Sequence, residues 1–451
     1  MGKRLIIVLA LALLVGLTFS AAYAEVQNVK VSGDITMSGV LRKHFGLMAA
    51  TAGDKSVLKQ SFLMSQTRVR VDADLTDNVM ATVRLINERI WNGQNDLNTA
   101  NSANSTNIDL DLAFVTLKEF LYSPLTLTVG RQNIKFGNGL VIGKSGASAN
   151  TTNIPTDLSE RRAFDAIRAT LDYDPLVVDL VYAKVRQTTT VDRNDIVLSG
   201  VNAAYALNKK TNISGYFYLK NDDFKAGAAA SRPQSDKVKT VGVLVTSTPI
   251  DNLNASLEAA YQFGRNSDAT NLNQKRHSAW ALQAMADYTF VKVKTTPKVG
   301  ASYTYLSGRD TGNGTVNEGW DPMFYDQALN GITYALLPMT NMSVLNLKAS
   351  CKPVEDVTLA ANYGYYDVAQ KNGGTLTSPS TYDAGAVYLN AVAYTGESHL
   401  GDALDLTAVY DYTEDVQFSL TGGLFRAGNA ITIASDKQVA QQVIGSMKVT
   451  F

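Results

Sequence analysis

The sequence of 451 residues is poor in the residue types that build catalytic and metal sites. Its single cysteine, Cys351, has no partner for an intramolecular disulfide, and its three histidines, His44, His277 and His399, are far apart in the chain. Neither the ligand spacing of a metal site nor a Gly-x-Ser-x-Gly nucleophile turn occurs. We therefore predict that the protein is not an enzyme and has no cofactor, and we interpret the histidines as solvated loop residues.

The sequence also lacks an excess of charge of either sign. It has 41 basic and 41 acidic residues, and without Lys3 and Arg4 the remainder carries 39 basic residues against 41 acidic ones. This balance gives no reason to expect nucleic acid as a partner, or a polybasic patch that binds a membrane surface.

Long apolar runs are missing, with one exception near the start. The basic "MGKR" precedes an apolar run from Leu5 to about Phe19, which ends in the small residues of "SAAYA". This order is typical of a secretory signal peptide, and the run is short for a membrane helix. We expect cleavage after Ala24, so that residues 1–24 are the signal peptide and residues 25–451 form the mature domain.

The sequence is rich instead in strict alternation of apolar and polar residues. In "NLNASLEAAYQF", for example, Leu257 lies on an apolar face and Glu258 on the opposite one. Alternation of this kind predicts half-buried β-strands. We count eighteen such segments, centred near residues 35, 68, 84, 113, 129, 167, 181, 202, 216, 243, 258, 284, 302, 347, 361, 406, 420 and 447. The count is open between sixteen and twenty, because residues 375–400 could form a strand, a loop hairpin or a plug, and residues 308–342 are long for a connection.

The connections between these segments fall into two classes. A short link such as "LTDN", "NKKT" or "YTED" follows every even-numbered segment, and a longer polar link follows every odd-numbered one. Transmembrane β-barrels have this arrangement, with short periplasmic turns and long extracellular loops. We predict an all-β fold, a closed antiparallel transmembrane β-barrel of about 18 strands in the outer membrane of a Gram-negative-type bacterium, surrounded by outer-membrane lipid.

The last segment, "QQVIGSMKVTF", continues the alternation up to Phe451. We expect it to be the closing strand, with its apolar parity facing lipid and Phe451 at the periplasmic interface. A final strand of this kind resembles the signal by which outer-membrane proteins reach the barrel assembly machinery, which is therefore an expected partner.

The polar face of the strands near residues 68 and 84 predicts part of the lumen wall. A register with Leu75 opposite Val79 matches apolar with apolar residues throughout and places Arg70 opposite Arg84, both pointing inward with Arg68. Like charges in such a pair repel unless they are neutralised. Asp72 and Glu88 are nearby acidic candidates to offset them. We expect removal of both arginines to lower anion preference at low salt and to leave stability intact or slightly improved. An ordinary charged pore wall is the plainer interpretation.

Alternation also places Arg162 and Arg168 inward on the sixth strand and Lys348 inward on a later one. On the fifth strand the parity of "LTLTVGRQNIKFG" conflicts, because strict alternation would turn Arg131 and Lys135 toward lipid. We predict a β-bulge at Gly130 that returns both to the lumen and moves Ile134 and Phe136 outside. The inward basic residues of the second, third, fifth and sixth strands would form one basic wall, and Lys348 lies apart from it.

Three stretches resemble the alginate-export family of outer-membrane β-barrel porins: "LTLTVGRQNIKFGNGLVIG", "RRAFDAIRATLDYDPLVVDLVYAKV" and "HLGDALDLTAVYDYTEDVQFSLTGGLF". The resemblance implies an eighteen-stranded barrel. It also implies that Arg131, Arg162 and Arg168 lie on strands that contribute basic pore-lining residues, as in the alginate-exporting member, which carries a polyanionic uronate polymer. The inward acidic residues here depart from that strongly positive lumen.

We therefore expect an outer-membrane channel for passive, anion-preferring passage of small solutes or, by family resemblance, of uronate-type saccharides. A structural or adhesive barrel with a plugged lumen is the alternative, and absence of conductance would identify it. A barrel enzyme would need Ser, His and Asp side chains that converge near the outer ends, and the scattered histidines disfavour it.

Overall fold

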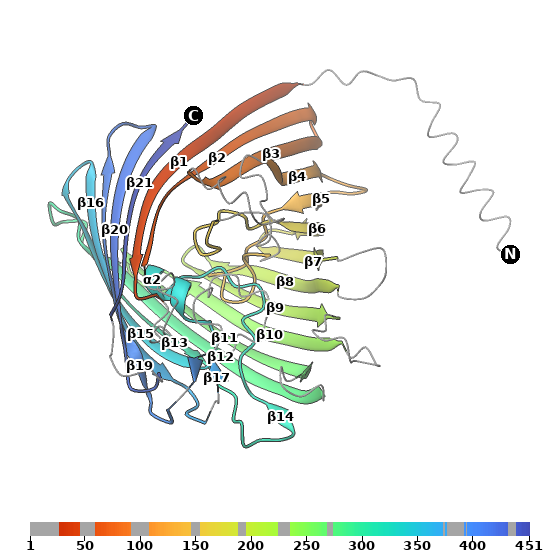
Figure 1. The fold of residues 1–451 in the computed structure, drawn as a ribbon. Helices are drawn as coiled ribbons and strands as arrows, with labels where there is room; N and C mark the ends of the chain where they lie inside the picture. The colour runs from red at the N-terminus through yellow and green to blue at the C-terminus, as the bar shows by residue number, and fades with distance from the viewer. Residues whose placement is uncertain are drawn as a thin grey trace, which may run out of the picture.

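The computed structural model describes residues 27–45, 59–91, 108–145, 154–187, 195–223, 235–267, 274–372, 375–376, 392–393, 395–431 and 439–451. The expected signal peptide lies outside these residues. Eighteen long strands surround a central space (Figure 1). They are β1 (Asn28–Lys43), β2 (Lys59–Thr76), β3 (Val79–Ile90), β4 (Asp109–Leu117), β5 (Leu125–Gln132), β6 (Phe164–Asp172), β7 (Leu176–Arg186), β8 (Ile196–Asn208), β9 (Thr211–Asp222), β10 (Asp236–Ser247), β11 (Leu253–Ser267), β12 (Gln274–Thr289), β13 (Lys298–Leu306), β15 (Met342–Val354), β16 (Val357–Val368), β19 (His399–Asp411), β20 (Val416–Ala427) and β21 (Val439–Thr450).

The sheet closes on itself. Each long strand pairs antiparallel with the next long strand, and β21 pairs with β1 over the range from Asp34 opposite Thr450 to Lys43 opposite Gln441. Reciprocal backbone hydrogen bonds between Gly33 and Phe451, of 2.8 and 3.0 Å, extend this seam to the last residue. Closure leaves no sheet edge unpaired, which a membrane-spanning sheet requires. The predicted eighteen-stranded antiparallel barrel is confirmed.

Short elements account for the two regions that left the count open. The pair β17 (Thr375–Leu376) and β18 (Val392–Ala393) forms a separate two-stranded sheet, so it adds no strand to the barrel wall, and the rest of residues 377–391 lies outside the described part. Between β13 and β15 the chain forms β14 (Val316–Asn317), which pairs with β12, and the helix α2 (Gly331–Leu336). None of the helices in the described ranges has the length and apolar character to cross a membrane.

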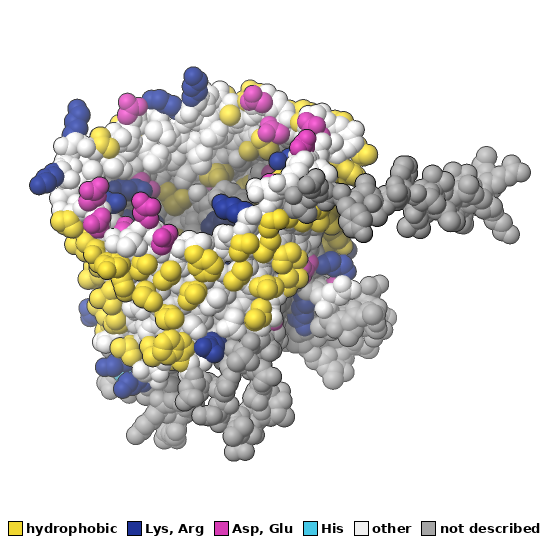
Figure 2. Space-filling model, turned by 90° about the horizontal axis from the view of Figure 1, so that it is seen from above, with side chains coloured by type: hydrophobic (Ala, Val, Ile, Leu, Met, Phe, Trp, Pro, Cys, Tyr) yellow, Lys and Arg dark blue, Asp and Glu magenta, His cyan; other side chains and the backbone are white. Residues whose placement is uncertain are grey.

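The two faces of the wall differ as alternation predicts. Leu257 and Leu406 are half-exposed on the outside, whereas their neighbours Glu258 and Asp405 are buried on the inside. In Figure 2 the outward apolar side chains form a broad band below the open end of the barrel, where Lys, Arg, Asp and Glu side chains are mixed. This band is the surface that contacts lipid.

Three segments of the chain fold inward and pack against the lumen wall: residues 133–145, 154–163 and 307–341. The first and third are joined by backbone hydrogen bonds, from Gly143 N to Phe324 O (2.7 Å) and from Asp326 N to Gly139 O (2.8 Å). Gly139 has φ +75°, and a Cβ there would lie 2.7 Å from the Asp326 carbonyl oxygen, so this contact requires glycine.

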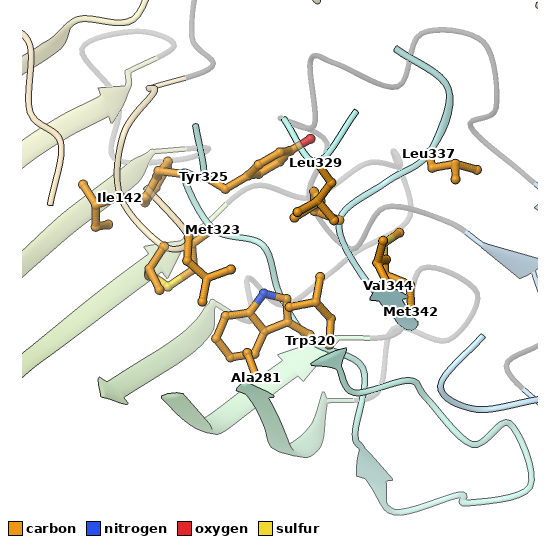
Figure 3. Close-up of a cluster of buried hydrophobic side chains, with 14 of the residues drawn as sticks. Ile142, Ala281, Trp320, Met323, Tyr325, Leu329, Leu337, Met342 and Val344 are labelled. Atoms are coloured by element: carbon orange, nitrogen blue, oxygen red, sulfur yellow. The ribbon is translucent and has the colours of Figure 1, made fainter. Parts of the chain in front are cut away.

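Apolar side chains fix the third inward segment. Trp320, Met323 and Leu337 are buried together with inward residues of the wall, including Ala281 and Val344 (Figure 3). This packing occupies part of the lumen next to β12 and β15. The opposite wall, β1 to β7, carries the ion pairs of Arg68, Arg70, Arg84 and Arg168.

Candidate functional site

Arg70 and Arg84 face each other across the β2–β3 pair, in the register that the alternation predicts. The turn differs, because a bulge between Asp74 and Thr76 places Thr76, not Leu75, opposite Val79. Each guanidinium has its own carboxylate: Arg70 Nε lies 2.7 Å from Asp72 Oδ2, and Arg84 Nε lies 2.5 Å from Asp111 Oδ2. The two arginines are thus two neutralised pairs rather than one repulsive pair.

Arg68 lies two residues farther from the turn, opposite Ile86, and also binds carboxylates. Its Nε donates to both oxygens of Asp34, at 3.1 and 3.0 Å, and its Nη1 lies 3.3 Å from Glu160. Glu160 belongs to the inward segment 154–163, so Arg68 joins this segment to the wall.

Glu88 has a different role from the predicted one. It is buried, and its carboxylate accepts hydrogen bonds from Gln66 Nε2 (2.8 Å), Ser159 Oγ (2.9 Å), the Glu160 backbone N–H (2.7 Å) and Arg161 Nε (3.1 Å). A carboxylate so fully occupied does not offset Arg70 and Arg84. It holds the inward segment against β3.

A second anchoring carboxylate, Asp326, comes from the third inward segment. It forms ion pairs with Arg162 and with Lys135, whose Nζ lies 3.5 Å from Asp326 Oδ2 and donates to the Asp326 carbonyl oxygen at 3.0 Å. Arg162 and Lys135 belong to the other two inward segments, so Asp326 ties all three together. Both basic residues lie in the lumen, on inward segments rather than on strands.

Lys144, on the first inward segment, is a buried cation close to this group. Its Nζ donates to the Thr156 carbonyl oxygen at 3.1 Å. Burial lowers the pKa of Lys144 below its ordinary value, and the positive charge of Arg162 acts in the same direction.

Arg168 lies on the lumen side of β6. Its Nε donates to Asp179 Oδ1 at 2.8 Å, and its guanidinium carbon lies 5.5 Å from the centroid of the Phe136 ring. Phe136 stacks on Tyr218 with centroids 5.9 Å apart. Phe136 is therefore inside the barrel, and the prediction that it faces lipid is wrong.

The bulge predicted at Gly130 does not form. The pairing of β5 with β4 and β6 runs without a register shift, and Arg131 stays opposite Asp165, 3.1 Å away, on the lipid-facing parity. Ile134 is fully buried inside, because the chain leaves the sheet after Gln132 and turns into the lumen. A strand that ends needs no parity reset, and the predictions for Arg131 and Ile134 are wrong.

Lys348, His277 and His399 are further residues singled out from the sequence. His399 is not a solvated loop residue: it begins β19, and its ring nitrogens lie 3.3 Å from Asp367 Oδ1 and 3.1 Å from Asp402 Oδ2. Lys348 is exposed on the lumen parity of β15, and no described residue forms an ion pair with it. His277 is not a solvated loop residue: it is fully buried on the inner face of β12, 3.2 Å from Gln262 Oε1. Within the described ranges, no group of three or more His, Cys, Asp or Glu side chains is arranged to hold a metal ion.

The alginate export family model matches residues 43–444. The chain belongs to the alginate export family. None of the curated proteins matches it. Among solved structures, the fold is similar to three proteins of Pseudomonas aeruginosa. OccK3 (OpdO) has 9% sequence identity and a TM-score of 0.56, and the match covers 95% of this chain and 97% of that one. OccK2 (OpdF) has 10% identity and a TM-score of 0.55, and OccK8 (OprE) has 12% identity and a TM-score of 0.54; both matches cover 94% of this chain and 99% of the other.

At these identities the structures show the fold alone. The family and the porin-like barrel together confirm the expected location in the outer membrane, and they support a channel.

In this member of the family, sequence reasoning missed three residues that organise the lumen: Arg161, Asp111 and Asp326. Arg161 binds both Glu88 and Asp109, and it is adjacent to Arg162 in the same "RRAF" stretch. Asp111 is covered because β4 has a register shift against β3 between Arg84 and Leu85, which a strict period of two does not reveal. Asp326 was visible only as a loop carboxylate in "WDPMFYDQ".

Proposed function

We propose that this chain is a passive outer-membrane channel, not an enzyme, that prefers small anionic solutes, uronate-type saccharides among them. The family and the barrel fold support a channel. The charged wall of β1 to β7 supports the preference for anions.

The main support for this proposal is that, in five ion pairs of the lumen, the basic side chain is more exposed than its carboxylate partner. The Arg168 side chain is 31% exposed and Asp179 only 6%; Lys135 is 48% exposed and Asp326 14%. The same order holds in three further pairs, Arg70–Asp72, Arg84–Asp111 and Arg162–Asp326. A solute in the lumen thus meets the cation first, with the carboxylate behind it, and a carboxylate group on the solute is attracted.

The preference is local rather than a field along the whole lumen. Most cations of the wall have a carboxylate, and Glu160 and Asp109 are the more exposed partners in their pairs with Arg68 and Arg161. Screening at physiological salt limits each field to about 8–10 Å. We therefore expect moderate anion selectivity that is strongest at low ionic strength.

The inward apolar segment 307–341 gives weight to a second candidate, a structural barrel whose lumen is plugged. Its buried side chains pack against the wall and against one another. The two candidates differ in one measurable property, which is conductance.

Single-channel recording of refolded protein in a salt gradient tests both. We expect discrete conductance and a reversal potential of the sign for anions. In Arg70→Gln with Lys135→Gln the reversal potential should move toward that of a non-selective pore, because both replaced side chains are exposed and Asp72 and Asp326 keep other donors. Arg131→Gln, on the lipid-facing parity, is the matched control and should keep the wild-type value. Cation selectivity of the wild type would refute the proposed preference, and absence of conductance would favour the plugged barrel.

A further inference from the structure

Three cations form a row on the outer surface of the barrel. Lys237 on β10 is opposite Arg265 on β11, and Arg265 is opposite Arg276 on β12. Their orientation follows from the strand neighbours, because Val238 and His277 are fully buried on the lumen side. Adjacent strands are about 4.8 Å apart, so the three side chains start from neighbouring positions.

This row has no carboxylate partner: no described residue forms an ion pair with Lys237, Arg265 or Arg276. Two other outward cations at the same end of the barrel do have carboxylate partners. Arg131 lies 3.1 Å from Asp165, and Lys184 lies 2.9 Å from Asp195. Like charges on directly opposed strand positions destabilise a sheet unless an anion neutralises them.

The height of the row on the barrel indicates what could supply that anion. Two residues toward the membrane centre on each strand, the next row contains Lys239 and Phe263, with Lys239 Nζ 5.6 Å from the centroid of the Phe263 ring. The row below contains Tyr261 opposite Trp280. Rings of this kind mark the boundary between hydrocarbon and headgroups, and a spacing of about 3.4 Å per residue puts the cations roughly 7 Å above Phe263.

We propose that Lys237, Arg265 and Arg276, supported by Lys239, bind the phosphate groups of a phosphorylated glycolipid of the outer leaflet. The long-loop end of the barrel is the extracellular one, so the row lies at the depth of that leaflet's headgroups. The acyl chains of the lipid would lie on the apolar face beneath, beside Val241 and Tyr261. Guanidinium and ammonium groups are the usual partners of phosphate oxygens. The site is on the outside of the wall, so the inference is independent of conduction through the lumen.

A second copy of the barrel fits this surface less well. A symmetric contact would place this row of cations against the same row of the second copy, and no carboxylate among the described residues lies between the two rows. Free phosphate fits the charges but not the aromatic and apolar surface directly below them.

The test is native mass spectrometry of the full barrel, refolded in detergent and titrated with purified lipopolysaccharide and, in parallel, with the same lipid after enzymatic removal of its phosphates. We expect wild type to retain the phosphorylated lipid in preference to the dephosphorylated one, and to lose it as salt is raised. Lys237→Gln with Arg265→Gln and Arg276→Gln should weaken retention by about tenfold or more. Arg131→Gln is the control for loss of an outward charge and should bind like wild type, because its partner Asp165 is 61% exposed and is not left as a buried charge.

Equal retention of both lipids by wild type overturns the proposal without any variant, so a folding defect in the triple variant does not leave it open. Wild-type retention by a folded triple variant overturns it as well. Competition of inorganic phosphate at equal concentration would show a free-anion site instead of a lipid site. Dimers that appear in wild type alone, without lipid, would assign the row to contacts between barrels.

Discussion

Replacing Arg84 should damage the barrel far more than replacing Arg70, although the two residues face each other. The difference lies in their carboxylates. Asp111, the partner of Arg84, is 0% exposed, and its Oδ1 has no hydrogen-bond partner among the described residues. Asp72, the partner of Arg70, is 26% exposed and also accepts a hydrogen bond from Thr82 Oγ1 at 2.6 Å.

Breaking a buried ion pair by removing one partner costs about 3–5 kcal/mol, because a charge is left buried and uncompensated. An exposed pair contributes about 1 kcal/mol or less. We therefore expect Arg84→Gln to lower the free energy of unfolding by about 3 kcal/mol and Arg70→Gln by about 1 kcal/mol or less. This replaces the expectation from register alone, that loss of both arginines would leave stability intact.

The assay is reversible urea unfolding of the barrel in lipid vesicles, with the free energy extrapolated to zero denaturant. The double variant Arg84→Gln with Asp111→Asn is the control. Its uncharged asparagine amide replaces the buried carboxylate that Arg84→Gln leaves without a partner, so it should recover most of the lost free energy of unfolding. Equal effects of Arg70→Gln and Arg84→Gln, or a double variant as unstable as Arg84→Gln, would refute the reasoning from burial.

Three further changes test other parts of the structure. Leu257→Arg should block assembly, at a cost of about 2–4 kcal/mol for a charge facing mid-membrane lipid, whereas Ser256→Arg on the lumen side should assemble; heat-modifiable gel migration distinguishes them, and equal tolerance would show the assigned faces to be wrong. Lys144→Met should remove a pH dependence: because burial lowers the pKa of Lys144 in the folded state from 10.5, the unfolded state binds more protons, and wild-type stability should rise with pH up to about that value while the variant's does not. Gly33→Val should weaken closure, because a Cβ at Gly33 would lie 2.6 Å from the Phe451 ring; the variant should fold more slowly into vesicles than wild type, and an unchanged rate would argue against the seam contact.

The architecture could be predicted because the membrane imposes the same requirements on each strand separately, so that the sequence of each strand is enough to identify it. Every lipid-spanning strand must present one apolar face and pair all its backbone groups, so a period of two and sorted connection lengths suffice to locate the strands. The eighteen predicted centres each fall within one long strand. The register of β2 with β3 was also predicted correctly from the apolar pattern, except at the turn. The bulge before Thr76 does not change that pattern, so it could not be predicted.

Alternation did not locate the end of the fifth strand. "LTLTVGRQNIKFG" was treated as one continuous strand, so its conflicting parity required a bulge. In the structure β5 stops at Gln132, and Ile134 and Phe136 are apolar because they pack inside the barrel. An apolar residue in a β-barrel can be buried by lipid or by an inward segment, and alternation alone does not distinguish the two.

The charges of the lumen illustrate the same point at longer range. Arg162 pairs with Asp326, 164 residues away, and Arg68 pairs with Glu160, 92 residues away, because the inward segments bring these carboxylates to the basic residues of the lumen. Inward parity therefore identifies which residues line the lumen but not the charge that a solute meets. That charge depends on which member of each pair is covered, as Asp111 is behind Arg84. It follows that the proposed anion preference would depend on the inward segments as much as on the arginines, and that shortening residues 307–341 should change selectivity without altering the sequence of any strand.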